Sequence, residues 1–157
     1  MDPQMATAFH LIPYGIYVLT TRPGPEPYAM IVSWVSQVSY APPLLMVALR
    51  RTRFALPAIQ GSGVFSLSLL RSEQKLWVAR FKNPISQQQF IELFFDTNKK
   101  SPPVLREALA SWECRVSSTL QPGDHILVIG EVCSTLTGRE GKPLTTADYG
   151  KTYIGQY

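Results

Sequence analysis

Cysteine and histidine are scarce in this chain of 157 residues, which contains two of each. Two cysteines are too few for the disulfide framework of a small secreted domain. Cys114, Cys133, His10 and His125 also lack the close ligand spacing of zinc sites, so the sequence predicts no metal site. We expect both cysteines to be reduced and largely buried.

Long apolar runs and secretory features are absent as well. No apolar stretch reaches the roughly 18 residues that a transmembrane helix needs. Residues 1–9 have neither the basic start nor the apolar centre of a signal peptide. The sequence therefore predicts a cytoplasmic protein with no membrane partner.

Charge is limited, because only 17% of the residues are charged and the net charge is +4. The chain lacks a basic stripe interleaved with aromatic residues, so a barrel that binds nucleic acid is the least favoured function. One basic cluster stands out, formed by Arg50, Arg51 and Arg53. Such a cluster binds a phosphate or forms a solvated surface, and the sequence leaves both open.

Several catalytic motifs are missing too. The sequence contains no G-x-G-x-x-G or G-x-x-x-x-G-K-[ST], which excludes the usual Rossmann and P-loop signatures. It contains no G-x-S-x-G, and its few acidic residues are scattered, which disfavours a serine hydrolase and a glycosidase. Any chemistry is therefore expected to depend on polar groups at strand ends.

Short segments rich in β-branched and aromatic residues dominate the chain, whose length fits one domain over residues 1–157. Strands are predicted over Tyr14–Thr21, Tyr28–Val35, Leu44–Leu49, Val64–Leu70, Ala108–Leu120 and His125–Leu136. The last two read as a hairpin around Pro122-Gly123-Asp124. Because no βαβ alternation is present, the pattern predicts an antiparallel barrel with two or three accessory helices.

Two helices are predicted between these strands. The first begins near Ala55 or Leu56 and ends at Gly61 to Gly63, since proline at 57 is tolerated only in a first turn. The second covers Glu73–Phe81, with Ser72 as its cap. Residues 90–95, FIELFF, fit a helix or a strand equally well.

Four finer expectations concern the strands. Ser36–Ser39 interrupts the apolar pattern, and Pro42-Pro43 favours an extended backbone. Leu44–Leu49 is apolar throughout, which predicts burial on both faces. Ser66 and Ser68 alternate with apolar neighbours, which predicts a polar face for their strand.

Polar groups follow two of the predicted strands. Ser33 to Gln37 come after one strand, and Arg50 to Thr52 come after another. Hydroxyl, backbone N–H and guanidinium groups hold phosphates, and an apolar shelf with aromatic edges suits a planar heteroaromatic ring. The alternative is that these serines only form turns.

Seven segments, taken in order, resemble one known family. They are YGIYVLTT, SWVSQVSYAPPLLMVAL, SGVFSLSLL, VARF, ALASWECRV, GDHILVIGEV and GKPL. From about Tyr14 to Tyr157 the chain resembles the flavin reductase-like, FMN-binding split-barrel proteins, which include flavoredoxins. The family often has Gly or Asn where Ala29 and Met30 stand, and Asn where Leu67 or Ser68 stands.

The resemblance implies a mainly β fold, an antiparallel, Greek-key-like split β-barrel with accessory helices. It implies a homodimer that binds FMN, or alternatively FAD, without a covalent bond. It further implies an NAD(P)H-dependent flavin reductase that passes electrons to free flavin or to an unknown acceptor protein. The alternative is a non-enzymatic FMN electron carrier.

The resemblance also assigns roles to individual residues. Flavin ring and ribityl contacts fall on Ser33, Trp34, Val35, Ser36 and Gln37; phosphate contacts on Arg50, Arg51, Thr52 and Arg53; backbone contacts on Ser66 and Leu67; closure of the helix side on Phe81. His125 matches the family histidine near the reactive face of the flavin and is the candidate catalytic residue. Each of two assignments has an alternative: Trp34 is a core or dimer-interface aromatic residue, and His125 is a structural residue. Tyr149 and Tyr153 either cover the flavin or pack the tail.

Overall fold

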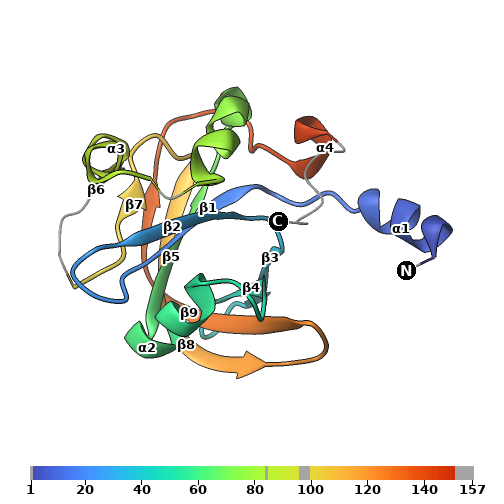
Figure 1. The fold of residues 1–157 in the computed structure, drawn as a ribbon, viewed down its shortest axis with the longest axis horizontal. Helices are drawn as coiled ribbons and strands as arrows, with labels where there is room; N and C mark the ends of the chain where they lie inside the picture. Colours follow the sequence, from blue (N-terminus) through green and yellow to red (C-terminus); the bar gives the residue numbers. More distant parts are fainter. Residues whose placement is uncertain (1, 84, 96–99, 151–157) are drawn as a thin grey trace.

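One antiparallel sheet organises the protein, whose computed structural model describes residues 2–83, 85–95 and 100–150 (Figure 1). Its seven strands run in the order β2-β1-β5-β8-β9-β4-β3. They are β1 Tyr17–Thr21, β2 Tyr28–Val32, β3 Val35–Ser39, β4 Leu44–Arg50, β5 Val64–Leu69, β8 Ala110–Leu120 and β9 His125–Thr137. A second sheet pairs β6 Phe94–Phe95 with β7 Val104–Leu105. The predicted mainly β, antiparallel fold is confirmed.

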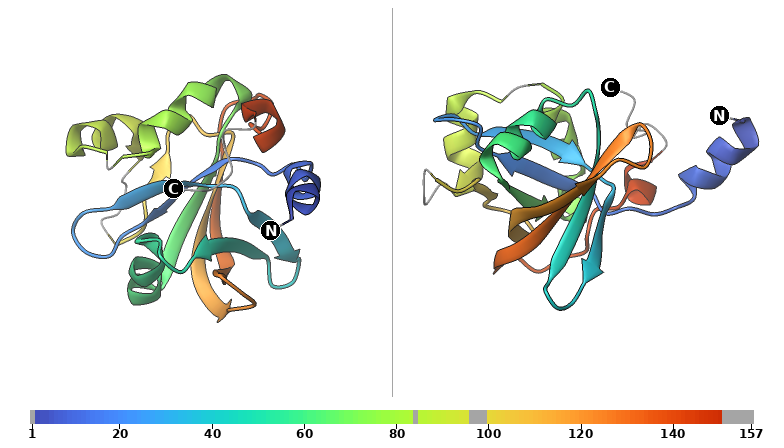
Figure 2. Two further views of the ribbon diagram at one scale, coloured as in Figure 1. Left: turned by 45° about the vertical axis from the view of Figure 1, so that its right-hand side comes forward. Right: turned by 90° about the horizontal axis from the view of Figure 1, so that it is seen from below.

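The β8–β9 hairpin joins the two halves of the main sheet (Figure 2). On one side β8 pairs with β5, and on the other β9 pairs with β4. Both strands carry register shifts, at Glu113/Cys114 and at Val116/Ser118 of β8, which increase the local twist of the sheet. This arrangement places the start of β9 beside the end of β4.

Helix α2, Ala55–Ser62, forms where the sequence predicts it. Pro57 falls in the first turn, where its missing N–H costs no helical hydrogen bond. Gly63 ends the helix with a left-handed φ of 70°, and its N–H donates to the carbonyl of Ile59 at 2.8 Å. The segment between β4 and α2 therefore contains only residues 51–54.

The structure describes four more helices. They are α1 Pro3–His10, the 3₁₀-helix η1 Ser72–Phe81, α3 Gln87–Leu93 and α4 Thr146–Tyr149. Arg71, not Ser72, caps η1, because the Gln74 side chain accepts the Arg71 N–H at 2.8 Å. Residues 90–95 divide between the end of α3 and β6. The sequence did not predict α1, which projects from the body and buries none of its residues (Figures 1 and 2).

Two apolar cores occupy the two sides of the sheet. One contains Leu19, Leu49 and Leu67, and the other contains Phe81 and Phe94. The predicted polar face of β5 does not face solvent, because Ser66 and Ser68 have no exposed area. Residues 102–105 cover this face: Ser66 donates to the carbonyl of Pro102 at 3.2 Å, and Ser68 accepts the N–H of Leu105 at 3.1 Å.

The structure corrects three expectations around β3. Val35–Ser39 does not break the sheet but forms its edge strand, where polar side chains face solvent and the backbone pairs with β4. Pro42 and Pro43 lie in a turn, not in extended backbone. Strand β4 is fully buried only at Val47 and Leu49, because it lies next to the edge of the sheet.

The two cysteines differ in exposure. Cys114 on β8 has no exposed area, whereas Cys133 on β9 is exposed, so the expected burial of Cys133 is wrong. Neither forms a disulfide. Cys133 lies on the half of β9 that extends past the apolar core.

Candidate functional site

Three chain segments separated in sequence meet at the junction of the two sheet halves. They are the connection Ser33–Trp34 between β2 and β3, Arg50 at the end of β4, and His125 at the start of β9. Arg50 and His125 are paired residues of the β4–β9 ladder. The Ala48 N–H donates to the Trp34 carbonyl at 2.9 Å, so the backbone fixes the position of Trp34 relative to β4.

Three rings form a row at this junction, which we call the aromatic row: Tyr14, Trp34 and His125. The imidazole of His125 lies 4.7 Å from the Trp34 ring, centroid to centroid, and Trp34 lies 6.1 Å from Tyr14. Trp34 is 46% exposed, so part of its indole remains open to a ligand. Tyr14 is anchored to α4, because its N–H donates to Oγ1 of Thr146 and its carbonyl accepts the Thr146 N–H.

The His125 side chain has a second fixed partner. Its Nδ1 lies 2.7 Å from Oδ1 of Asp124. The hydrogen bond from His125 lowers the pKa of Asp124, with smaller contributions from the charges of His125 and Arg50. The Asp124 carboxylate is therefore ionised at neutral pH, beside the imidazole and within the field of an arginine.

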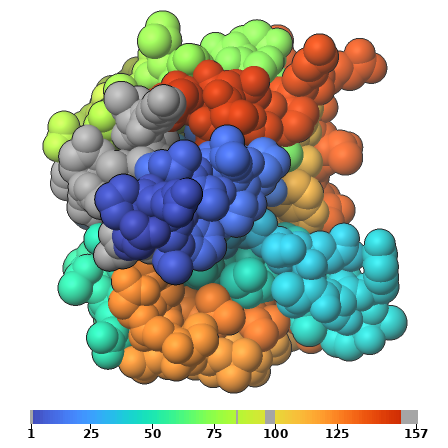
Figure 3. Space-filling model, turned by 90° about the vertical axis from the view of Figure 1, so that its right-hand side faces the viewer, coloured from blue at the N-terminus to red at the C-terminus, as the bar shows by residue number. Residues whose placement is uncertain are grey.

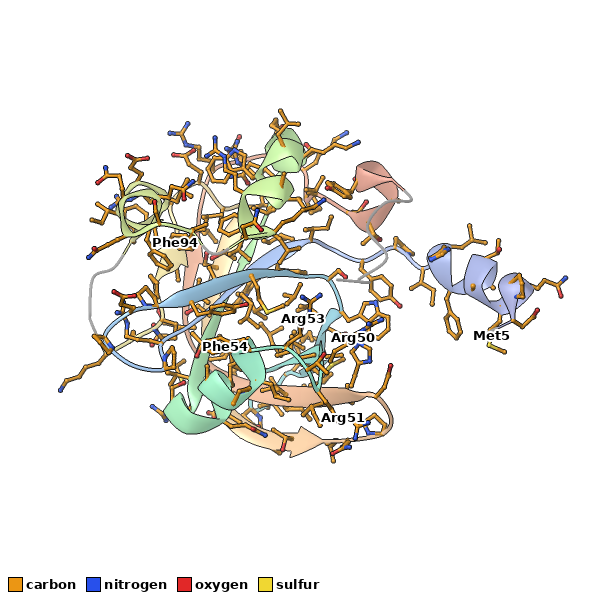
Figure 4. All side chains as sticks on the ribbon, viewed as in Figure 1. Met5, Arg50, Arg51, Arg53, Phe54 and Phe94 are labelled. Atoms are coloured by element: carbon orange, nitrogen blue, oxygen red, sulfur yellow. The ribbon has the colours of Figure 1, made fainter. Side chains whose placement is uncertain are left out.

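The basic cluster is divided by the fold. Figure 4 draws Arg50 and Arg53 close together between β2 and β4, whereas Arg51 lies nearer the β8–β9 hairpin. Arg50 and Arg53 are half-buried, while Arg51 and Thr52 are exposed. The Arg53 N–H donates to the Arg50 carbonyl at 3.0 Å, which holds these two residues in a turn before α2. Two half-buried arginines, one of them paired in the ladder with His125, and a partly exposed indole suit a ligand with a phosphate and a planar ring.

A family model described as "Flavin reductase like domain" matches residues 9–155. The chain belongs to this family. It is similar to a flavin reductase (NADH) of Kitasatospora aureofaciens, with 36% identity over 124 residues, 77% of this chain and 64% of that protein. It is also similar to a diflavin flavoprotein of Synechocystis sp., with 31% identity over all of this chain but 27% of that protein. The chain thus spans less than two thirds of either relative.

Solved structures of flavin reductases have the same fold. The styrene monooxygenase flavin reductase of Pseudomonas putida is 31% identical, with a TM-score of 0.78 over 90% of each chain. The flavin reductase component of a bacterial two-component tryptophan halogenase has a TM-score of 0.84 over 95% of this chain, at 23% identity. At 23% identity, the similarity to the halogenase component shows a shared fold and nothing more.

The predicted flavin-contacting stretch is split between two places. Trp34 joins the aromatic row, and Ser33, which is half-buried, adjoins it. Val35, Ser36 and Gln37 instead line a hollow of about 500 Å³ on the sheet. The other residues of the hollow are Tyr17, Pro43, Leu44, Leu45, Trp112, Val132 and Thr135.

The structure does not bring three other predicted residues to the aromatic row. Ser66 and Leu67 are buried in β5, whose backbone is paired on both sides by β1 and β8. Those ladders already occupy the backbone groups that a ligand would need. Phe81 packs in the core that contains Phe94, away from the core beneath Arg50 and His125.

The sequence interpretation missed two residues of the site. Asp124 was assigned only to the hairpin turn, although its position beside His125 is a local signal for a carboxylate–imidazole pair. Tyr14 was assigned only to a strand, and no local pattern shows its contact with Trp34, because the fold alone brings them together. Tyr149 lies 5.9 Å below the Lys75 ammonium, and Tyr153 lies outside the described residues.

Two features are absent from the part of the chain that the structure describes. No three histidine, cysteine or acidic side chains gather in a way that could hold a metal ion. None of its helices combines the length and apolar character needed to cross a bilayer.

Proposed function

We propose that the protein is an NAD(P)H-dependent flavin reductase that binds FMN at the aromatic row. The observation that carries this proposal is the convergence of Trp34, Arg50, Arg53 and His125 at one junction of the sheet. The relatives named NADH flavin reductase and NADH-dependent FMN reductase support it. FAD is the alternative flavin, since one neighbouring structure is named an NADH:FAD oxidoreductase.

Each group at the junction has a distinct task in this proposal. Arg50 and Arg53 bind the phosphate by charge-assisted hydrogen bonds, which are stronger than neutral ones. The exposed part of the Trp34 indole contacts the flavin ring or the nicotinamide, and His125 offers a ring nitrogen to the reacting edge. Bound FMN supplies the hydride-accepting ring, while the protein supplies position and electrostatics.

The reduced flavin leaves the site or passes its electrons to a separate acceptor. Two structural neighbours are named as flavin reductases of a styrene monooxygenase and of a two-component halogenase. A comparable oxygenase-type acceptor, or free flavin, is the partner proposed here. We place the reaction in the cytoplasm, where both nicotinamide nucleotides are available.

We also propose that the working form is a homodimer. The hollow beside β3 exposes parts of Tyr17, Leu45 and Trp112. The β3–β4 hairpin, cyan in Figure 3, protrudes from the surface, and its Val38 and Tyr40 are 48% and 89% exposed. Apolar surface of this kind is typical of a protein interface. Gel filtration at micromolar concentration should give a dimer that Tyr40→Asp weakens; a flavin-bound monomer would contradict this part of the proposal.

Turnover distinguishes a reductase from the alternative electron carrier. The protein, a large excess of free FMN and NADH are mixed, and NADH oxidation is followed. A reductase oxidises many equivalents of NADH per protein, whereas a carrier without a nicotinamide site oxidises none. NADPH in place of NADH gives the nucleotide preference in the same assay.

A further inference from the structure

The hydrogen bond between Asp124 and His125 determines which nitrogen of the imidazole carries a proton. An ionised carboxylate accepts hydrogen bonds but donates none. Since Oδ1 of Asp124 lies 2.7 Å from Nδ1 of His125, the hydrogen between them belongs to Nδ1. In the neutral imidazole, Nε2 is then the nitrogen with a free lone pair, and in the charged form Nε2 is a free donor.

Two contacts fix the orientation of the ring as well. Asp124 binds its edge, and the indole of Trp34 covers one face with an interplanar angle of 34°. Asp124 is itself held, because its carbonyl accepts the Arg51 N–H at 3.4 Å across the end of the β4–β9 ladder. Among the described residues no hydrogen-bond partner is seen for Nε2, whereas Nδ1 is already occupied.

We propose that Asp124 is the positioning residue of the site: it holds His125 as the Nδ1–H tautomer and leaves Nε2 for the nicotinamide or the flavin edge. This inference rests on the proposed reductase function and adds a residue to it. Asp124 acts through His125 and has no contact of its own with the reacting groups. Its side chain is 80% exposed, so water competes for the hydrogen bond and limits the effect.

The test is a double-mutant cycle on the rate of flavin reduction by NADH per bound flavin. Asp124→Asn, which keeps the shape but is able to donate as well as accept, should slow reduction about tenfold, the lower end of what the orienting partner of a functional histidine contributes. In a His125→Ala background the same change should alter the rate less than twofold. Glu140→Gln, which removes one exposed negative charge elsewhere, is the control and should match wild type.

A measurement independent of activity reads the tautomer directly. The chain has only two histidines, His10 and His125, so ¹⁵N-imidazole spectra are simple to assign. In mildly alkaline buffer His125 should show a protonated Nδ1 and a bare Nε2, and Asp124→Asn should weaken that preference without changing His10. A His125 that is protonated at Nε2 in the wild-type protein would overturn the proposal.

Two failures are distinguishable. If wild-type protein binds FMN and is not reduced by either nucleotide, the proposed function is contradicted. If wild-type protein is reduced but Asp124→Asn is reduced equally fast, or slows equally in both backgrounds, the reductase remains and the positioning role of Asp124 is overturned. Unchanged FMN affinity in Asp124→Asn confirms that a slower rate does not reflect lost cofactor.

Discussion

The imidazole of His125 lies against the indole of Trp34, with 4.7 Å between the ring centroids. Trp34 reaches this position from the connection between β2 and β3, whereas His125 opens β9. The contact thus depends on the pairing of β4 with β9, and it brings a ring system to the same place as Arg50.

Removal of the half-buried arginines should weaken FMN more than riboflavin. Only FMN carries the phosphate, and a hydrogen bond to a charged group contributes about 1.5 to 3 kcal/mol, roughly 10- to 150-fold in Kd. Arg50→Ala and Arg53→Ala should each show this selective loss in titrations of both ligands. Arg51→Ala is the matched control and should lose less, because Arg51 is exposed and lies apart. Equal losses for both ligands would mean that these arginines only shape the fold.

His125→Ala should slow the reduction of bound flavin by NAD(P)H about 100-fold, because a positioned proton donor or orienting group is lost. FMN affinity should change far less, since the arginines are untouched. Stopped-flow reduction and thermal melts on the same variant separate catalysis from stability. A lower melting temperature with an unchanged reduction rate would show that His125 is structural.

The two thiols should react at very different rates in the folded protein. Burial raises the pKa of Cys114 to about 12, with smaller contributions from Cys133 and Glu113, so its nucleophilic thiolate is almost absent at neutral pH. Cys133 is exposed and should react at once with a thiol reagent such as dithionitrobenzoate. One thiol should therefore be titrated in native buffer and two in denaturant. Two fast thiols in native protein would contradict the burial of Cys114.

Gly138→Ala should destabilise the protein by about 2 kcal/mol, because the added Cβ would clash with the backbone of Ala108 and force one of the two segments to shift. The atom that such a Cβ would meet is the carbonyl oxygen of Ala108. The same substitution at Gly24, where a Cβ meets nothing within 4 Å, is the control. Urea unfolding followed by circular dichroism measures both. Equal stabilities of the two variants would show that the chain around residue 138 relaxes freely.

Elements set by local signals were predictable from the sequence. Gly63 marks the end of α2, and the Pro122-Gly123-Asp124 turn marks the β8–β9 hairpin, because each is a conformational requirement of a few neighbouring residues. Strand β3 was missed because its polar residues are stabilised by edge pairing with β4, which is a long-range property. The burial of Ser66 was missed for the same reason, since its cover comes from residue 102.

The candidate site shows the same division. Trp34 and Arg50, which lie near the ends of two strands, were proposed from the chain order and the family resemblance, and His125, which opens β9, was proposed from the resemblance. Arg51 lies apart from Arg50 and Arg53, and Tyr14 contacts Trp34, because of how distant segments pack. The spacing of residues in the sequence does not predict either arrangement. Phe81 and Leu67 were assigned to the flavin by resemblance, yet the structure packs both into cores.

Anaerobic mixing of FMN-loaded protein with NADH shows whether the protein accepts a hydride from the nucleotide. The oxidised flavin absorbs visible light and loses most of this absorbance on two-electron reduction. We expect complete bleaching by one equivalent of NADH or NADPH, with a rate that His125→Ala lowers about 100-fold. Persistent yellow colour with excess of both nucleotides, in protein that holds FMN, would contradict the reductase function.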